Sequence, residues 1–500
     1  MEFKDDLVDY ESFGARADGV SDDLPAICDA HAYANEHGLG VRTRPDATYH
    51  LGGRALTAVI ATDTDWNTSR FTIDDSRLDR VEDHKKPLFE VRSLLEPEEL
   101  QIERLRRDQK RVDARPERDC LVLVENDNKR VYIRRGLNRN EGTPQHDVFV
   151  LRRDGSVDSP IDWDYDEVTR VKAWPIEETP LVIRGGVFTT FANRMEQEKG
   201  YNYWSRNIVI SRSNTEFDGL THYVVGETAV GHPYSGFLNV RRCADVTLRN
   251  CFATGHKIYS TIGAAGEPVS MGSYDYSASN VVNFRMIGCR MNHILDRTRW
   301  GVIGSNFCKN ILLEDCELSR MDTHQGVSGT YTIRRCTLGH MGLNAIGRGR
   351  LTVEDSTLYG SRLVNFRRDY GSTWEGELVI RNCRWIPACG ETVWPRMIGV
   401  SNDGMHDFGY RCSMPAEVMI DGLFVDDSNH PEDYEGLYFF SDPDAAGEGG
   451  EELPPTGERP FPYKPCRKVT VRDLETASGR QPQLSPSEEL NAGTLVVEQQ

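Results

Sequence analysis

One short strand pattern recurs through the middle of the chain and constrains its fold more than any other feature. Apolar and polar residues alternate, and each copy ends in a small residue, at Cys251, Cys289, Cys316, Cys336, Ser356 and Cys383. These positions are separated by 38, 27, 20, 20 and 27 residues, a spacing typical of a solenoid in which each repeat forms one coil. Looser copies lie at 179–186, 207–211, 416–422 and 467–473.

The chain has twelve cysteines, and their placement favours free thiols over disulfides. Because each strand has one buried face, residues at equivalent positions of successive coils are expected to stack in the same core. The repeated cysteines are therefore predicted to be buried, small apolar side chains. No C-x-x-C pair is present, so we expect no structural zinc site. No metal-binding residues or cofactor are predicted, and calcium binding is left open.

A second pattern, at residues 13–27, predicts a helix close to the N-terminus. Gly14 and Gly19 permit tight turns, Asp22 can accept hydrogen bonds from the first N–H groups of a helix, and Pro25 suits its first turn. Helical spacing of apolar residues then predicts a helix over 24–37 with one buried face, formed by Leu24, Ile27, Ala30 and Ala34.

Residues 13–27 resemble the FGA-x-x-DG-x-x-DD-x-x-AI segment of the pectate-lyase-like and phage-tailspike superfamily. The resemblance implies an all-β fold, a right-handed parallel β-helix whose N-terminal capping helix closes one end of the solenoid. It also implies action on polysaccharides and, by analogy, a homotrimer. No catalytic motif of the superfamily accompanies it, because the paired aspartates and Gly-His-Gly of polygalacturonases and a calcium-binding carboxylate cluster are both missing.

The repeat disappears between residues 75 and 178, where we expect an inserted β-rich subdomain. A charged run at 96–113 predicts a helix, and turn residues at 125–128 and 154–155 predict hairpins. The expected organisation is an N-terminal cap with the first coils at 1–74, the insertion at 75–178, the parallel β-helix at 179–483 and a C-terminal tail at 484–500.

Composition excludes several classes of partner. A formal net charge of −19 and a pI of about 5.2 argue against binding to nucleic acid. No apolar run reaches transmembrane length, so no membrane partner is expected. The first residues lack the features of a signal peptide. They predict a cytoplasmic location for the chain as given, or a secreted or periplasmic one if a signal peptide was removed.

Titratable side chains follow the repeated cysteines at similar offsets. His293 lies four residues after Cys289, and Asp322 and His324 lie six and eight residues after Cys316. Because coils stack in register, these side chains are expected to line one groove. The candidate catalytic residues are Asp296, Asp322, His324 and Asp369, and the candidate substrate-binding residues are His293, Arg297, Arg299, Trp300, His340, Arg348, Arg367, Arg368, Tyr370 and Trp374.

Three functions fit this groove, all with an oligo- or polysaccharide as ligand. Glycoside hydrolysis needs two carboxyl groups, and we expect Asp322, with His324 nearby, to act as the general acid. β-Elimination on a uronate, or epimerisation, would use arginines to neutralise the carboxylate and His324 or Tyr370 as base. The third alternative is a non-catalytic, tailspike-like glycan-binding module. Available carboxylates favour the hydrolase.

Overall fold

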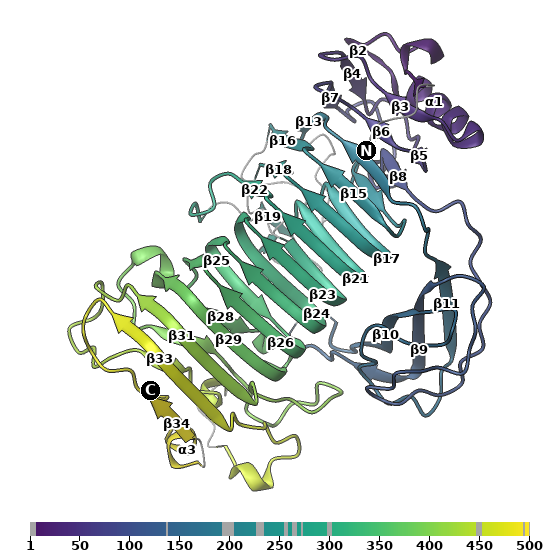
Figure 1. Ribbon diagram of the computed structural model, residues 1–500. Helices are drawn as coiled ribbons and strands as arrows, with labels where there is room; N and C mark the ends of the chain where they lie inside the picture. The colour runs from purple at the N-terminus through teal and green to yellow at the C-terminus, as the bar shows by residue number, and fades with distance from the viewer. Residues whose placement is uncertain are drawn as a thin grey trace.

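The chain folds into a long stack of coils with a smaller β-rich unit against its side (Figure 1). The computed structural model describes residues 7–136, 139–192, 205–226, 235–254, 259–262, 268–271, 274–297, 303–446, 453–493 and 496–499. Within these ranges, no helix is long and apolar enough to cross a membrane.

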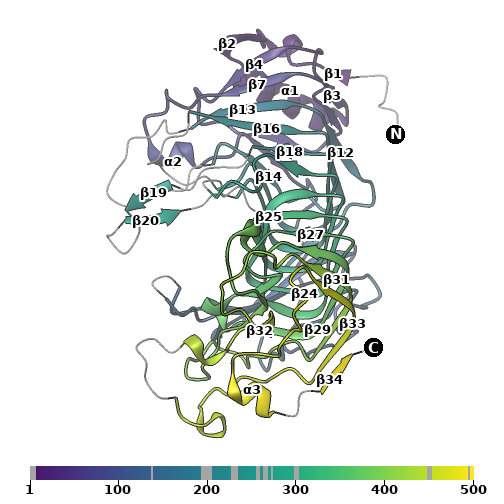
Figure 2. The same ribbon diagram turned by 90° about the vertical axis from the view of Figure 1, so that its left-hand side faces the viewer.

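One parallel sheet system runs the length of the solenoid (Figure 2). Its N-terminal strands are β1 (Leu7–Val8), β2 (Asp18–Asp22), β3 (Gly40–Arg42), β4 (Thr48–Leu51), β5 (Ala58–Ile60), β6 (Thr64–Asp65), β7 (Arg70–Ile73), β8 (Phe89–Val91), β12 (Leu181–Arg184), β13 (Val187–Phe191), β14 (Ile208–Ile210), β15 (Thr215–Asp218) and β16 (Thr221–Val225). Its central strands are β17 (Leu238–Arg249), β18 (Phe252–Ala253), β21 (Tyr276–Ile287), β22 (Arg290–Met291), β23 (Ile303–Glu314), β24 (Glu317–Arg334), β25 (Thr337–Ala345), β26 (Gly347–Glu354), β27 (Thr357–Leu358) and β28 (Val364–Phe366). Its C-terminal strands are β29 (Trp374–Trp385), β30 (Arg396–Gly399), β31 (Glu417–Val425), β32 (Tyr438–Phe440), β33 (Lys468–Thr476) and β34 (Val496–Gln499).

The residue before each repeated small residue forms a turn, and this turn directs the chain from one face of the solenoid to the next. Asn250, Gly288, Asp315, Arg335, Asp355 and Asn382 all have a left-handed backbone, with φ between 46° and 66°. At Asp315, for example, the backbone N–H donates to the carbonyl of Arg334 in the next coil. The residue after each turn faces the core, where Cys251, Cys289, Cys316, Cys336 and Cys383 are at most 5% exposed. All twelve cysteines are free, which confirms the prediction of buried thiols at these positions.

The helices of the fold are α1 (Leu24–His37), α2 (Val81–His84) and α3 (Glu488–Ala492). The short 3₁₀ turns are η1 (Glu11–Phe13), η2 (Arg368–Tyr370), η3 (Pro387–Gly390), η4 (Asp444–Ala446) and η5 (Thr456–Glu458). Helix α1 has the predicted bounds and buried face, and it closes the N-terminal end of the core. The Asp22 carboxylate accepts from the N–H of Leu24, the first residue of the helix, at 3.2 Å, although the N-cap position itself is Asp23.

The inserted subdomain has its own antiparallel sheet, β10–β9–β11, formed by β9 (Cys120–Val131), β10 (Thr143–Leu151) and β11 (Arg170–Pro175). A separate two-stranded antiparallel pair joins β19 (Tyr259–Ile262) to β20 (Pro268–Met271). The solenoid sheet extends as far as β8, which pairs with β5 and β14, so the insertion begins after residue 91 and not at 75.

Two local predictions for the insertion are wrong. Residues 96–113, all described, form no helix; Ile102 and Leu105 pack into the core of the subdomain, and Leu105 makes an antiparallel bridge to Tyr165. The expected turn at 125–128 forms no hairpin but lies inside β9, where residues 127–129 bulge out between Asn126, opposite Gln145, and Arg130, opposite Pro144. The turn at Gly155 is present, with φ of 81°.

The C-terminal segment is more than a tail. β34 pairs in parallel with β33 and thereby adds a last strand to the sheet. Leu490 of α3 is buried in the solenoid core.

Candidate active site

The Asp322 carboxylate lies at the centre of a buried polar network on β24. Its side chain has no exposed surface. It is paired with the Arg320 guanidinium, and Arg367 Nη1 lies 3.0 Å from both of its oxygens. His324 Nε2 lies 2.9 Å from Oδ2, and Tyr274 Oη lies 3.4 Å from the same oxygen. A carboxylate with two guanidinium partners is favoured in its ionised form.

Arg367, in the loop after β28, links Asp322 to a second carboxylate. Its Nε and Nη2 donate to Asp369 at 3.0 and 2.7 Å, and Arg134 of the insertion lies 2.9 Å from Asp369 Oδ2. Burial alone would raise the pKa of Asp369, but the hydrogen bonds and charge of Arg367 outweigh it and hold the pKa below its usual value. Asp322 and Asp369 are therefore poor proton donors, in contrast to the general-acid role expected for Asp322.

His324 and Tyr274 form the proton-exchanging part of this network. The Tyr274 Oη and His324 Nε2 atoms lie 2.6 Å apart, and the His324 side chain is 30% exposed. Desolvation, together with the charges of Arg367 and Arg320, lowers the pKa of His324 well below 6.5. The imidazole is therefore neutral near pH 7. With its proton on Nδ1, Nε2 accepts the phenol hydrogen bond and can take up the phenol proton, after which Asp322 stabilises the imidazolium.

Three expected substrate contacts have structural roles in the fold. The Trp374 ring has no exposed surface, because it faces the core at the start of β29, so it offers no stacking platform. Tyr370 is 1% exposed and packs beneath Arg134 and Arg367. Arg348 binds Asp108 at 2.9 Å and Asp162 at 3.3 Å, so it fastens the insertion to the solenoid.

The remaining candidates lie along the surface near these coils. His293 and Asp296 are exposed on the turn after β22, and Arg297 pairs with Glu391 at 2.8 Å. His340 is half-buried, with Nδ1 3.0 Å from the Ile294 carbonyl. Arg368 is exposed at the start of η2. Arg299 and Trp300 lie outside the described residues.

Sequence reasoning missed three members of the network. Arg320 is two residues before Asp322, so strand alternation could have placed both on one face. Tyr274 precedes β21 and belongs to no repeated offset. Arg134 comes from the insertion, and no sequence signal connects that segment with η2.

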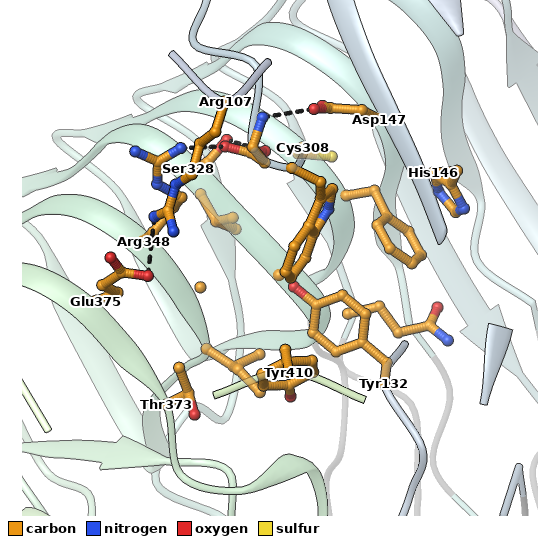
Figure 3. A pocket seen from close by; sticks show the side chains of 18 of the residues that line it. Arg107, Tyr132, His146, Asp147, Cys308, Ser328, Arg348, Thr373, Glu375 and Tyr410 are labelled. Atoms are coloured by element: carbon orange, nitrogen blue, oxygen red, sulfur yellow. Dashed lines mark hydrogen bonds and ion pairs between the residues drawn. The ribbon is translucent and has the colours of Figure 1, made fainter. Parts of the chain in front are cut away.

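A pocket of about 100 Å³ lies close by, where the insertion meets β23, β24 and β26 (Figure 3). Tyr132, Trp163, Phe307 and Tyr410 contribute its aromatic lining, and Arg107, Asp147, Asp162, Gln325, Ser328, Arg348 and Glu375 contribute polar groups.

Beside this pocket, a buried ionic contact joins the two units. Lys309 Nζ, on β23, lies 2.6 Å from Asp147 and 3.3 Å from Asp162, both in the insertion. Burial raises the pKa of Asp147, although Lys309 acts in the opposite direction. Lys309 and Asp147 are each at most 2% exposed, so this contact is sealed from solvent.

Known proteins share the fold of this chain, and one curated protein is similar to part of its sequence. No protein-family model matches the chain. A curated relative, the capsule KL64-specific depolymerase of Klebsiella phage P510, is 36% identical over 94 residues, which are 17% of this chain and 9% of the relative. The chain thus spans less than a tenth of that relative's length.

Solved structures of phage tailspikes align over nearly the whole chain. The tailspike gp49 of Pseudomonas phage LKA1 has a TM-score of 0.53 at 13% identity, covering 98% of this chain and 84% of its own. The gp54 tailspike of Acinetobacter baumannii bacteriophage AP22, solved with A. baumannii capsular saccharide, has a TM-score of 0.50 at 12% identity, covering 98% and 79%. Together with the sheet topology, these alignments confirm the predicted resemblance: the chain has the parallel β-helix fold of the phage tailspikes.

Proposed function

We propose that this protein is a polysaccharide-degrading enzyme whose reaction centre is the chain of hydrogen bonds from Tyr274 through His324 to Asp322. The observation that carries the proposal is the 2.6 Å contact between Tyr274 Oη and His324 Nε2, with Asp322 a further 2.9 Å away. The phenol and the carboxylate both contact Nε2 of the neutral imidazole, so Nε2 can receive a proton from the phenol, hold it beside the carboxylate and return it. The similarity to a capsule depolymerase over 94 residues supports a polysaccharide as substrate.

The geometry favours β-elimination over the hydrolysis expected from the sequence. Hydrolysis requires a protonated carboxyl group beside an ionised one. Asp322 and Asp369 share Arg367 as a partner, and each has a further arginine, so both are held as carboxylates. Elimination needs a base and a cation; the network supplies the base, and the exposed Arg368, next to Arg367 in the chain, is available as the cation.

In the proposed reaction, Tyr274 loses its phenolic proton to His324 Nε2 and accepts the C5 proton of a uronate residue. The electron pair of that C–H bond forms the C4–C5 double bond as the C4–O bond breaks, and the departing oxygen takes a proton from Tyr274. Asp322 stabilises the transient imidazolium, which returns its proton to the Tyr274 oxygen at the end of the cycle. Arg368, which is exposed at the start of η2, is the proposed partner of the uronate carboxylate.

The tailspike and depolymerase neighbours come from bacteriophages, and this supports action on surface polysaccharides outside the cell rather than in the cytoplasm. A homotrimer also remains a proposal. Sedimentation of the purified chain would test it.

Product chemistry tests the function. The protein is incubated with acidic and neutral polysaccharides, and both new reducing ends and the ultraviolet absorbance of unsaturated uronates are recorded. We expect both signals to rise together on a uronate-containing glycan. Reducing ends without absorbance would reject elimination in favour of hydrolysis, and binding without either signal would indicate a non-catalytic module.

A further inference from the structure

We propose that the pocket between the insertion and the solenoid binds one sugar residue that carries an acyl group, such as an acetamido group. The choice of a sugar as ligand rests on the proposed function. The preference for an acyl group rests on the pocket itself. Aromatic rings line it, a buried amide N–H of Gln325 has no acceptor among the described residues, and most of its charged side chains already form ion pairs.

Aromatic rings from both units surround the cavity (Figure 3). The Tyr132 ring centroid lies 5.2 Å from that of Phe307, 5.0 Å from Tyr410 and 6.4 Å from Trp163. The pocket volume of about 100 Å³ would hold several water molecules, enough space for an acyl group and part of a sugar ring. Rings at these separations offer an apolar surface to the C–H face of a sugar and to an acyl methyl group.

Phe307 occupies a turn position where an aromatic residue is sterically unfavourable. The register places it between Asn280 in the preceding coil and Gly326 in the next, and all three have left-handed backbones with φ of 50°, 57° and 78°. Asparagine and glycine adopt this conformation readily, whereas bulky residues rarely do. Tyr132, opposite Phe307, also has a φ of 52°. Arg242, one coil before Asn280, has the same conformation with φ of 54°, so the solenoid tolerates a large side chain at this turn. The two aromatic residues both face the cavity, which adds two rings to the surface that a ligand would contact.

Gln325 supplies a hydrogen-bond donor at the same place. Its side chain lines the pocket and the residue is 4% exposed, yet its Nε2 has no acceptor among the described residues. A buried amide without a partner is costly, and an acyl carbonyl oxygen from a ligand would satisfy it.

Most charged groups that line the pocket are already paired; among the described residues the exception is Arg411, which is exposed at the surface. Arg107 lies 2.8 Å from Glu375, Arg348 binds Asp108 and Asp162, and Lys309 binds Asp147 and Asp162. A charged ligand would have to compete with these contacts. A neutral acylated sugar, with its carbonyl at Gln325 and its methyl group against the rings, would leave them intact.

Binding to small glycosides tests the proposal without any cleavage. Methyl 2-acetamido-2-deoxyglycosides of the gluco, galacto and manno series are compared with the matching glycosides that lack the acetamido group. Affinity is measured by calorimetry, and saturation-transfer NMR identifies the contacting protons. We expect at least one acetamido glycoside to bind at least tenfold more tightly than its unacylated counterpart, with the strongest transfer to its acetyl methyl group.

Two variants locate the binding. Phe307→Asn introduces the residue of the preceding coil, so the fold should keep its melting temperature while affinity falls at least tenfold. Gln325→Met should remove the preference for the acetamido glycoside. Tyr223→Asn, at an exposed ring on β16, is the control and should bind normally. No binding by any glycoside, equal binding of both series, or normal binding by both pocket variants would each overturn the proposal. Failure of the elimination reaction would affect none of these results.

Discussion

Arg367 Nη1 lies 3.0 Å from both carboxylate oxygens of Asp322, inside a coil where Asp322 has no exposed surface. The other side of the same guanidinium binds Asp369, so one arginine joins β24 to η2. Because two guanidinium groups hold it as a carboxylate, Asp322 is suited to position and stabilise His324 rather than to donate a proton.

Asp322→Asn should therefore destabilise the fold as well as abolish activity. It leaves the buried Arg320 and Arg367 without their charged partner, and breaking a buried pair in this way costs about 3–5 kcal/mol. Urea denaturation measures the change. The exposed Asp296→Asn variant is the control and should stay within about 0.5 kcal/mol of the parent. An unchanged urea midpoint for Asp322→Asn would show that the network is not a structural unit.

The contact between Lys309 and Asp147 should be strongly coupled. Lys309→Met leaves Asp147 buried without its cation, which should cost about 3–5 kcal/mol and loosen the insertion from the solenoid. Adding Asp147→Leu should recover much of that loss, because the uncompensated carboxylate is then gone. Limited proteolysis and urea unfolding of the double-mutant cycle measure both effects. Additive losses would contradict the coupling.

Stability should fall as the pH drops below about 6.5, and His31 in α1 should contribute to that fall. Burial lowers the pKa of His31 from 6.5 to about 3. Between these two pH values the unfolded chain binds the proton and the folded protein does not. The contribution of His31 to the free energy of unfolding is therefore complete above pH 6.5, and it decreases by about 1.4 kcal/mol for each pH unit below that value.

Urea unfolding at pH 7 and pH 5 measures this dependence. His31→Gln should unfold with a weaker pH dependence than the parent, because its side chain does not titrate. His37→Gln, at an exposed site in the same helix, should behave like the parent. The same slope in all three proteins would exclude His31 as the titrating group.

The stacked thiols should resist labelling in the native protein. A hydrogen bond with Cys289, together with burial, raises the pKa of Cys316 to about 12, and burial raises that of Cys383 to about 11. Only the partly exposed Cys28 and Cys389 are expected to react before denaturation, and all twelve thiols afterwards. Rapid native labelling of most thiols would be incompatible with the coil packing.

The repetitive part of the fold could be predicted because its signals are local. Each Cys position follows a left-handed turn, as Asp315 precedes Cys316, and this unit recurs in every central coil. The insertion could not be predicted in the same way. Ile102 and Leu105 have a spacing that suits a helix, but the chain there is irregular, and both side chains pack into the core of the insertion.

The site was partly predictable for the same reason. Stacking correctly brought Asp322, His324, Arg367 and Asp369 into one network, although their roles stay proposals. Trp374 was predicted to contact the substrate, but its side chain faces the core. The alternation of buried and exposed residues along β29 shows this, whereas the residues next to Trp374 in the sequence do not. Tyr274 and Arg134 reach the network through irregular segments, where side-chain direction depends on the folded chain.

The turnover of Tyr274→Phe on a cleaved polysaccharide tests the central claim most directly. The variant keeps the ring and removes only the proton-carrying oxygen, so the account predicts a fall in kcat of about a hundred- to ten-thousand-fold with an unchanged melting temperature. The exposed Tyr223→Phe variant should retain the parent's kcat. A Tyr274→Phe enzyme that forms unsaturated product at the parent's rate would contradict the proposed reaction centre.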